Sequence, residues 1–446
     1  MNNRVMWRPS AEQVARANLT ALIRYVRQQH HARVDDYAAL ERWAIDEPAA
    51  FWEALWQFTG VRASRACDAV MEGYPHMPGT RWFVGSRLNF AENLLRFRDD
   101  RPALVGWTEN GPYRTLTYRQ LYSEVAAVAA ALRAAGLVPG DRVAGYLPNT
   151  IEAVVAMLAA TSLGGVWSSC SPDFGVPAVI DRFGQIEPKF LFAASSYQYA
   201  GKRFDLAERV AAIRSALPSL AAAIVVPYPG EPRPAESAPG CLAWESLAAT
   251  GQTELTFAQL PFDHPLYILY SSGTTGAPKC IVHSAGGILV QHLKEHVLHC
   301  DLRREDRMMY FTTCGWMMWN WLVSSLAVGL TVVLYDGSPL SPHTGILFDV
   351  AQTERLTVLG TSPKYLAAIA QAGLVPGESH DLASLRLVLS TGAPLSGTGF
   401  DYVYSSVKPD VQLASISGGT DLCASFAIGN PVAPVYRGEM QTRALG

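Results

Sequence analysis

The residues best suited to chemistry lie in one short stretch, Tyr270-Ser-Ser-Gly-Thr-Thr-Gly-Ala-Pro-Lys-Cys280. Its glycines can adopt positive φ and let backbone N–H groups approach a polyanion, its hydroxyls donate hydrogen bonds, and its lysine adds a positive charge. This composition predicts a phosphate-binding loop. It is not a Walker-type loop, which requires G-x-x-x-x-G-K-[ST], because the two glycines here are three residues apart and the lysine follows a proline. The residues predicted to contact phosphate are Ser271, Ser272, Gly273, Thr274, Thr275, Gly276 and Lys279.

Two further polar turns follow predicted strands. The strand predicted over 386–390 leads into Thr391-Gly-Ala-Pro394, and the strand over 411–416 leads into Ser417-Gly-Gly-Thr-Asp421. With the strand over 266–270 that leads into the 270–280 loop, three predicted strands end in small polar turns, and a further strand is predicted over 357–360. In a parallel sheet, ligands bind outside the carboxyl ends of the strands. The sequence therefore predicts that these turns form one pocket.

The elements that must position these turns alternate between strands and helices from residue 103 onward. A capping box, Thr117 with Gln120 three residues later, starts the first helix, and Gly136 ends it. Repeated strand–helix–strand units imply a mostly parallel sheet covered on both faces. The proline-rich segment 225–240 is predicted to be a surface excursion that separates two sheet-bearing subdomains. The other predicted strands cover residues 103–107, 143–147, 166–168, 190–194, 222–226, 266–270, 308–312 and 330–335.

Composition limits the classes of protein that this chain can belong to. It has 446 residues, of which 49% are hydrophobic and 17% charged, so we expect a globular protein of several packed subdomains. The formal net charge of −3 argues against nucleic acid or an anionic membrane as the main partner. Seven cysteines without C-x-x-C spacing and a polar start, Met1-Asn-Asn-Arg, predict a cytoplasmic location. The apolar run 153–167 is too short to span a bilayer and predicts a buried helix.

A predicted helix after the phosphate loop carries His292, Glu295, His296 and His299 on one face. Such spacing can bind zinc, but the chain has no His-Glu-x-x-His signature and no evident distant acidic ligand. We therefore expect a solvated or packed face, and we expect His283 to be a turn or core histidine rather than a catalyst.

Several motifs resemble a known family. The 270–280 loop resembles the signature loop of the adenylate-forming ligases, which include acyl-CoA synthetases, luciferases and peptide-synthetase adenylation domains. The helical segment before residue 95 ends in Trp82-Phe-Val-Gly-Ser-Arg-Leu-Asn89, which resembles the linker of the acetyl-CoA synthetase branch. Two tryptophan-containing strings, 167–175 and 314–321, resemble the acetoacetyl-CoA synthetase subfamily. The resemblance implies a helical cap over 1–95 and an AMP-binding core domain over 96–446.

The resemblance also implies roles for individual residues. Gly392, Ala393 and Pro394 would line an adenine slot. Thr420 would contact the α-phosphate, Asp421 would hold Mg²⁺, and Lys279, Thr420 and Asp421 would form the catalytic set. Most relatives have glutamate where this chain has Asp421. The segment Gly201-Lys202-Arg203 matches a CoA-phosphate contact, although a solvated charged face is an equally good interpretation of so short a match.

The predicted acyl pocket is formed by Trp316, Met317, Met318 and Trp319, with Asn320 or a tryptophan N–H available to a 3-keto oxygen. Ordinary core packing is the alternative for this aromatic and methionine-rich run. Gly418 and Gly419 stand where acetyl-CoA synthetases have the aromatic residues that close a small acetate pocket, which favours a larger acyl chain here.

The implied reaction is that of an acetoacetate–CoA ligase. It would convert acetoacetate and ATP into acetoacetyl-adenylate and then, with CoA, into acetoacetyl-CoA, AMP and pyrophosphate, with Mg²⁺ as cofactor. Its partners would be small molecules, and the sequence does not indicate an oligomeric state. A ligase for another short acid, such as propionate or butyrate, and a non-catalytic nucleotide-binding fragment are the alternatives.

The implied fold is α/β, the large N-terminal domain of these ligases, with two mostly parallel sheets in a layered αβαβα arrangement. Family members continue with a Thr-Gly-Asp motif, a hinge and a small lysine-bearing domain. Here the only Gly-Asp is Gly140-Asp141, and no lysine follows Lys408. We therefore expect an incomplete barrel-like third subdomain and no small C-terminal domain, and turnover by this chain needs a direct test.

Overall fold

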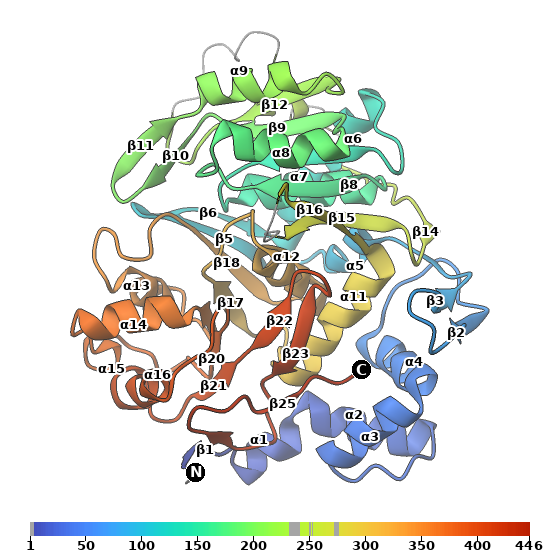
Figure 1. Ribbon diagram of the computed structural model, residues 1–446, viewed down its shortest axis with the longest axis vertical. Helices are drawn as coiled ribbons and strands as arrows, with labels where there is room; N and C mark the ends of the chain where they lie inside the picture. The colour runs from blue at the N-terminus through green and yellow to red at the C-terminus, as the bar shows by residue number, and fades with distance from the viewer. Residues whose placement is uncertain (1–3, 232–240, 249–250, 252, 272–275) are drawn as a thin grey trace.

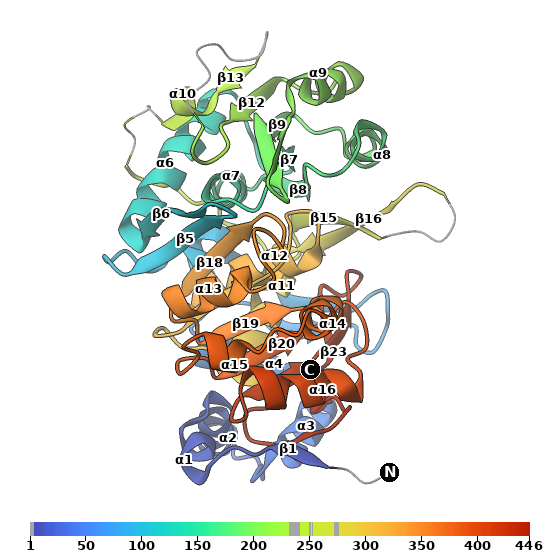
Figure 2. The same cartoon turned by 90° about the vertical axis from the view of Figure 1, so that its left-hand side faces the viewer.

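The computed structural model describes residues 4–231, 241–248, 251, 253–271 and 276–446 (Figure 1). Two sheets of seven strands dominate this described part of the chain, with strand orders β13-β12-β9-β7-β8-β15-β16 and β21-β20-β19-β17-β18-β5-β6. Each is parallel except for one antiparallel edge pair, β15–β16 or β5–β6. The predicted α/β fold with mostly parallel sheets is therefore confirmed. Figures 1 and 2 show one sheet in the upper half of the molecule and the other below it.

The strands of the first sheet are β7 (Arg142–Tyr146), β8 (Val166–Cys170), β9 (Phe190–Ala194), β12 (Ala222–Val226), β13 (Leu242–Ala243), β15 (Pro265–Ser271) and β16 (Lys279–Ser284). Those of the second sheet are β5 (Pro102–Thr108), β6 (Gly111–Thr117), β17 (Arg307–Tyr310), β18 (Thr331–Asp336), β19 (Val358–Thr361), β20 (Leu387–Ser390) and β21 (Gln412–Ser415).

The connecting helices are α6 (Tyr118–Ala134), α7 (Ile151–Ser162), α8 (Val176–Ile186), α9 (Ala207–Ala216), α10 (Trp244–Ala248), α11 (Ala285–Leu293), α12 (Met317–Ser324), α13 (Ile346–Thr353), α14 (Pro363–Gln371), α15 (Pro376–Ser379) and α16 (Gly397–Tyr402). Two π-helical segments, η1 (Lys294–His299) and η3 (Val403–Val407), and one 3₁₀ segment, η2 (Ser325–Val328), extend α11, α16 and α12.

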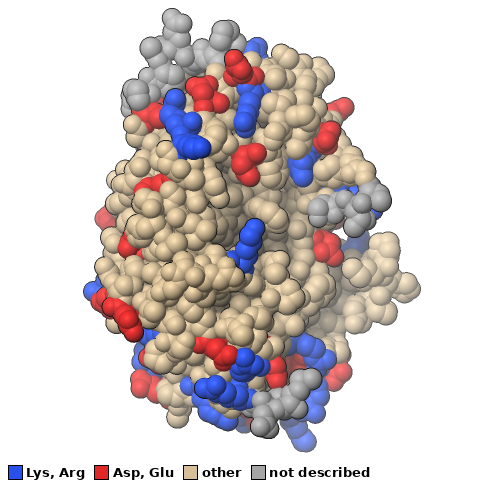
Figure 3. All heavy atoms as spheres, turned by 60° about the vertical axis from the view of Figure 1, so that its left-hand side comes forward, with Lys and Arg blue, Asp and Glu red and all other residues tan. Residues whose placement is uncertain are grey.

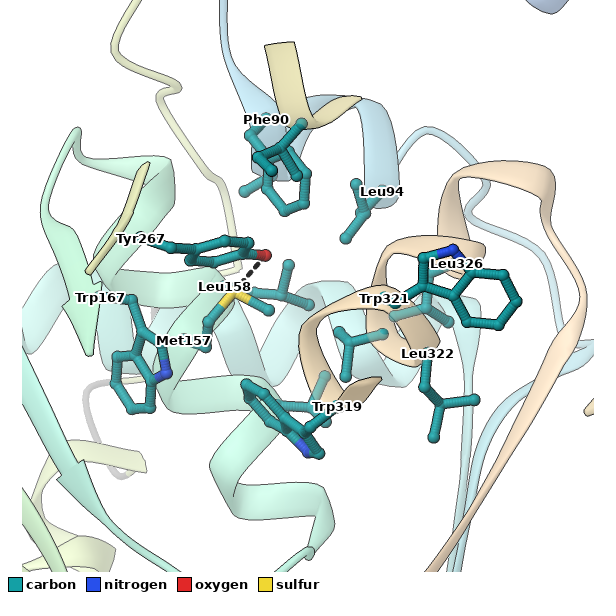
Figure 4. Close-up of a cluster of buried hydrophobic side chains, with 14 of the residues drawn as sticks. Phe90, Leu94, Met157, Leu158, Trp167, Tyr267, Trp319, Trp321, Leu322 and Leu326 are labelled. Carbon is teal, nitrogen blue, oxygen red and sulfur yellow. Dashed lines mark hydrogen bonds between the residues drawn. The ribbon is translucent and has the colours of Figure 1, made fainter. Parts of the chain in front are cut away.

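The helix predicted to be buried, α7, lies in the interior. Every residue of α7 is buried, as expected for a helix that is apolar on all sides. Figure 4 shows Met157 of α7 beside Tyr267 of β15 and Trp319 of α12, so the core joins elements from both halves of the chain. The capping box at Thr117 is also present, with the Thr117 hydroxyl accepting from the Gln120 N–H at 3.2 Å.

One sequence prediction about the sheets is wrong. The proline-rich segment does not separate two sheets, because β12 before it pairs with β13 after it in one sheet; residues 232–240 themselves lie outside the described residues. The strand predicted over 103–107 precedes β7 in sequence but belongs to the other sheet, where it pairs with β18. Strand patterns reveal burial, whereas sheet membership depends on contacts between residues far apart in sequence.

The segment before residue 95 is mostly helical, and its first four helices lie toward the base of the molecule, whereas its last helix lies higher, against the core (Figure 1). It contains α1 (Ala11–Arg16), α2 (Asn18–Gln29), α3 (Tyr37–Asp46), α4 (Pro48–Thr59), α5 (Phe90–Leu94) and the strands β1 (Val5–Trp7), β2 (Ala69–Glu72), β3 (Arg81–Val84) and β4 (Arg87–Leu88). Helices α2 and α4 contact η1 and α11. This segment is therefore joined to the helix that follows the phosphate loop.

A small antiparallel sheet, β22-β23-β25, occupies the region where a barrel-like subdomain was expected. Its strands are β22 (Ser417–Gly419), β23 (Ala424–Ile428) and β25 (Thr442–Arg443), and β24 (Val435–Tyr436) pairs with β1 near the other end of the chain. The remaining strands are β10 (Ser196–Tyr199), β11 (Lys202–Asp205) and β14 (Leu260–Pro261). None of the helices in the described residues is both long and apolar enough to cross a membrane.

Candidate active site

A cavity of about 500 Å³ lies at the carboxyl ends of the second sheet. Three segments converge on it: the residues after β17, the turn after β20, and the turn from β21 into β22. These three strands run parallel in one sheet, so their carboxyl ends share one edge. The face drawn in Figure 3 is hollowed near mid-height, and few charged side chains border the hollow.

The cavity brings together many of the predicted site residues. Its walls include Trp316, Met317, Met318, Gly392, Ala393, Pro394, Gly418, Gly419 and Thr420. The walls thus combine residues predicted to bind adenine with residues predicted to bind the acyl group, which sequence reasoning assigned to separate stretches of the chain.

Two predicted pocket residues, Trp319 and Asn320, are not among the lining residues. Both are fully buried. Trp319 donates its indole N–H to Asn149 Oδ1 at 3.0 Å and lies in the apolar core shown in Figure 4. Successive residues of an α-helix point about 100° apart, so α12 presents some of its residues to the cavity and turns others inward. For Trp319 the alternative of core packing is correct, and Asn320 does not face the cavity.

The predicted phosphate loop joins the antiparallel strands β15 and β16, in which Ser271 pairs with Lys279. Lys279 is exposed and Gly276 has φ of 102°, in the region that favours glycine. The predicted phosphate contacts Ser272, Gly273, Thr274 and Thr275 lie outside the described residues. The described part of the loop leaves Lys279 at the start of a strand that runs on to His283.

His283 links this strand to the turn that carries Thr420 and Asp421. Its Nε2 lies 2.8 Å from the carbonyl oxygen of Thr420. A carbonyl only accepts, so Nε2 carries the proton and donates. Burial lowers the pKa of His283, which favours the neutral imidazole. The sequence assigned His283 no part in the site, and no local pattern signals this contact, because the two partners are 137 residues apart.

Gly418 and Gly419, the two glycines before Thr420, lie so close to neighbouring atoms that a side chain would not fit. A Cβ at Gly418 would lie 2.1 Å from the carbonyl oxygen of Ala424, and a Cβ at Gly419 would lie 2.2 Å from Asp421 Oδ1. Both glycines do line the cavity, but the volume a side chain would need is already occupied. The Asp421 carboxylate therefore folds back over Gly419.

The sequence predicted either a solvated or a packed face for the histidines after the loop, and the structure shows a packed one. His292, His296 and His299 are buried and bind Ser324 Oγ or the backbone carbonyls of residues such as Gly429. The pKa of His292 is lowered to about 4 by burial, and burial also lowers that of His296 and His299. No group of three or more metal-binding side chains occurs among the described residues.

The segment Gly201-Lys202-Arg203 lies in the β10–β11 hairpin and does not line the cavity. The backbone N–H of Gly201 donates to Glu109 Oε2 at 2.7 Å. Arg203 pairs with Glu231, and this hydrogen bond raises the pKa of Arg203. These contacts favour a structural role for Gly201 and Arg203, and the neighbouring Lys202 is exposed.

Comparison with known proteins identifies the family. The model described as "AMP-binding enzyme" matches residues 90–437. This chain belongs to the AMP-binding enzymes. A second model, "Acetyl-coenzyme A synthetase N-terminus", matches residues 37–94, which run from α3 to α5.

Individual AMP-binding enzymes match almost the whole chain. Acetoacetyl-coenzyme A synthetase of Rhizobium meliloti is 49% identical over 447 residues, which cover 99% of this chain and 68% of the relative. Acetoacetyl-CoA synthetase of Gallus gallus is 44% identical over 100% of this chain and 68% of its own. The solved structure of acetoacetyl-CoA synthetase from Streptomyces lividans superposes with a TM-score of 0.94 at 45% identity, covering 99% of this chain and 69% of that chain.

Proposed function

We propose that this chain is the catalytic core of an acetoacetate–CoA ligase that activates acetoacetate with ATP. The observation that carries the proposal is the single cavity whose walls combine the Gly392–Pro394 turn, Thr420 and the Trp316–Met318 segment. One cavity can then hold a nucleotide and a short acyl chain in contact. The choice of acetoacetate as substrate rests on the names of the two relatives described above, which are 49% and 44% identical to this chain over 99% and 100% of its length.

The chemistry requires positioning and charge neutralisation rather than a side-chain nucleophile. A carboxylate oxygen attacks the α-phosphorus of ATP while pyrophosphate leaves, and both reactants are anions. Lys279 and the hydroxyls of the phosphate loop would bind the β- and γ-phosphates, and Thr420 would contact the α-phosphate. The turn Gly392-Ala393-Pro394 would receive adenine, because small residues admit a flat ring. The acyl-adenylate would then be captured by CoA.

Asp421 suits the magnesium ion that this family uses. Mg²⁺ prefers hard oxygen ligands, retains several waters, and is often held by one carboxylate together with substrate phosphates. Asp421 is an exposed carboxylate next to cavity-lining Thr420, so it can reach a metal bound to phosphate at the rim. When bound, the ion would offset the negative charge of the phosphates. Lys202 would be the contact to a CoA phosphate within the β10–β11 turn.

The acyl group would lie against Trp316, Met317 and Met318. Trp319 and Asn320 are buried away from the cavity, so they would support this wall from behind. Gly418 and Gly419 would form the opposite side, where their backbone approaches the substrate closely.

The proposal is tested by measuring ATP–pyrophosphate exchange with acetoacetate, acetate, propionate and butyrate. We expect exchange to depend on an added acid and to be fastest with acetoacetate at equal subsaturating concentrations. A preference for the unsubstituted acids would refute acetoacetate as the substrate. Retained binding of AMP without exchange for any acid would instead favour a nucleotide-binding fragment.

A second substrate class has specific support. Malonamoyl-CoA synthetase of Penicillium aethiopicum is 40% identical over 99% of this chain and 65% of its own length. Malonamate carries a carbonyl at the same position as acetoacetate but has an amino group in place of the methyl group. Including malonamate in the exchange assay distinguishes the two substrates.

A further inference from the structure

A buried carboxylate, Glu295, lies behind one wall of the cavity. Glu295 is among the lining residues, yet its side chain is only 1% exposed. It belongs to the π-helical segment η1, whose successive residues Lys294, Glu295 and His296 are all buried. A π-helical turn is rare and is often found at a functional site. A buried charge lowers stability unless hydrogen-bond donors surround it, so Glu295 must have such partners.

Glu295 holds two cavity walls together. Its Oε2 accepts from the indole N–H of Trp321 at 2.8 Å, and its Oε1 accepts from the backbone N–H of Ser425 at 2.8 Å. The ammonium group of Lys294 lies 3.9 Å from Oε1 and offsets the charge without forming a short hydrogen bond. Trp321 and Ser425 belong to α12 and β23, so one carboxylate sets the positions of both elements.

The hydroxyl of Ser425 has a weaker attachment. Its Oγ lies 3.3 Å from Glu295 Oε2, well beyond the 2.7–2.8 Å that is usual for a hydroxyl donor. The carboxylate keeps both of its 2.8 Å donors if this hydroxyl turns away. Ser425 lines the cavity and pairs across the β22–β23 ladder with Gly418, which has no side chain to cover it. The hydroxyl can therefore turn from its long contact with Glu295 and donate to a ligand.

Few other side-chain donors reach the cavity from α12 and β23. The indole N–H groups of Trp319 and Trp321 are taken by Asn149 and Glu295, and Asn320 is not among the lining residues. Met317 and Met318 have no donor. Thr391 donates to the Ile416 carbonyl at 2.9 Å, and Ser415, Ser417 and Thr420 line the cavity at and after the end of β21. Among the described lining residues of β23, α12 and the residue before α12, the side-chain donors that remain are Ser425 and Trp316, and Trp316 is 65% exposed. A hydrogen bond discriminates best when the donor is shielded from water.

We propose that the Ser425 hydroxyl donates a hydrogen bond to the 3-oxo oxygen of the acyl substrate and that Glu295 is the positioning residue that holds Ser425 in place. The inference rests on the proposed function and extends it, because it names the group that distinguishes acetoacetate from butyrate. On binding, the hydroxyl exchanges its long contact with Glu295 for a short bond to the ketone. No proton is transferred.

The test is a fluorescence titration of the protein with acetoacetate and with butyrate, which has the same chain length but lacks the oxo group. Trp316 and Trp321 line the cavity and report occupancy without requiring turnover. For the parent chain we expect acetoacetate to bind about 10-fold more tightly than butyrate, the size of one net hydrogen bond. Ser425→Ala should bring the ratio of the two dissociation constants to about 1, with butyrate affinity changed less than about threefold.

Further variants separate recognition from general damage. Ser425→Cys retains the size of the side chain with a much weaker donor and should also lose the preference, whereas Ser425→Thr retains the hydroxyl and should keep most of it. Glu295→Gln should reduce the preference more than it weakens butyrate binding, which a purely structural role would not do. Ser405→Ala, an exposed serine outside the cavity, is the matched control.

The outcomes distinguish the two proposals. A parent chain that prefers acetoacetate, with Ser425→Ala and Ser425→Cys retaining that preference, would overturn the role of Ser425 and leave the proposed function intact. A parent chain that binds butyrate as tightly as acetoacetate would overturn both proposals.

Discussion

Replacing Gly419 with alanine should displace the Asp421 carboxylate while leaving the fold intact. The added Cβ would lie 2.2 Å from Asp421 Oδ1, whereas ordinary van der Waals contact begins near 3.4 Å, so the carboxylate must move by about 1.2 Å. The clashing atom is the end of a flexible side chain, and Gly419 does not have a positive φ. We therefore expect the free energy of unfolding to change by less than about 1 kcal/mol.

The effect on the reaction should be much larger. A misplacement of about 1 Å in a positioning group can lower a rate by about 100-fold. We expect Gly419→Ala to lower kcat/KM for ATP–pyrophosphate exchange by about 10- to 100-fold and to raise the Mg²⁺ concentration required for half-maximal exchange. The assay is exchange measured across a Mg²⁺ titration, together with urea unfolding of the same preparations.

Gly418→Ala is the informative comparison. Its Cβ would lie 2.1 Å from the backbone carbonyl oxygen of Ala424, which cannot move aside as a side chain can. This variant should lose stability, through strain between β22 and β23, in addition to activity. If Gly419→Ala exchanged at the parent rate with an unchanged Mg²⁺ requirement, the assignment of Asp421 to the metal would be refuted.

Three further predictions concern buried polar groups. His283→Ala removes the donor to the Thr420 carbonyl and should lower the rate of ATP–pyrophosphate exchange by about 10-fold. His283→Gln can donate from a similar position and should recover part of this loss. Equal exchange rates for the two variants would contradict the positioning role of His283. Burial lowers the pKa of Lys294 to about 8, so between about pH 8 and 10.5 the unfolded chain binds this proton more tightly than the folded protein does. The free energy of unfolding should therefore rise with pH in that window, by up to about 3 kcal/mol relative to Lys294→Met. An equal change of the free energy of unfolding with pH in the two proteins, measured by urea unfolding, would contradict this. Burial lowers the pKa of His299 to about 3, so the free energy of unfolding should fall as the pH drops below about 6.5, by about 2 kcal/mol between pH 7 and pH 5. Urea unfolding at both pH values should show a smaller loss for His299→Asn.

Short-range patterns determined much of the fold. The strands predicted over 190–194 and 222–226 match β9 and β12, because apolar runs of only five residues are long enough for a buried strand and short for a helix. The capping box at Thr117 was predictable because its hydrogen bonds join residues three apart. The convergence of the turns after β20 and β21 followed from the rule that parallel strands share one carboxyl edge.

The sequence by itself determined the types of the elements, the phosphate-loop motif and the turns that border the cavity, since each depends on residues close together in the chain. Only the tertiary structure decided which side chains face the cavity. Trp316, which precedes α12, lines it and Trp319 does not, because α12 packs on α11 and β17 with one particular side inward. The contact of Glu295 with Ser425 joins residues 130 positions apart. Such contacts depend on how distant segments pack, and no local pattern carries that information.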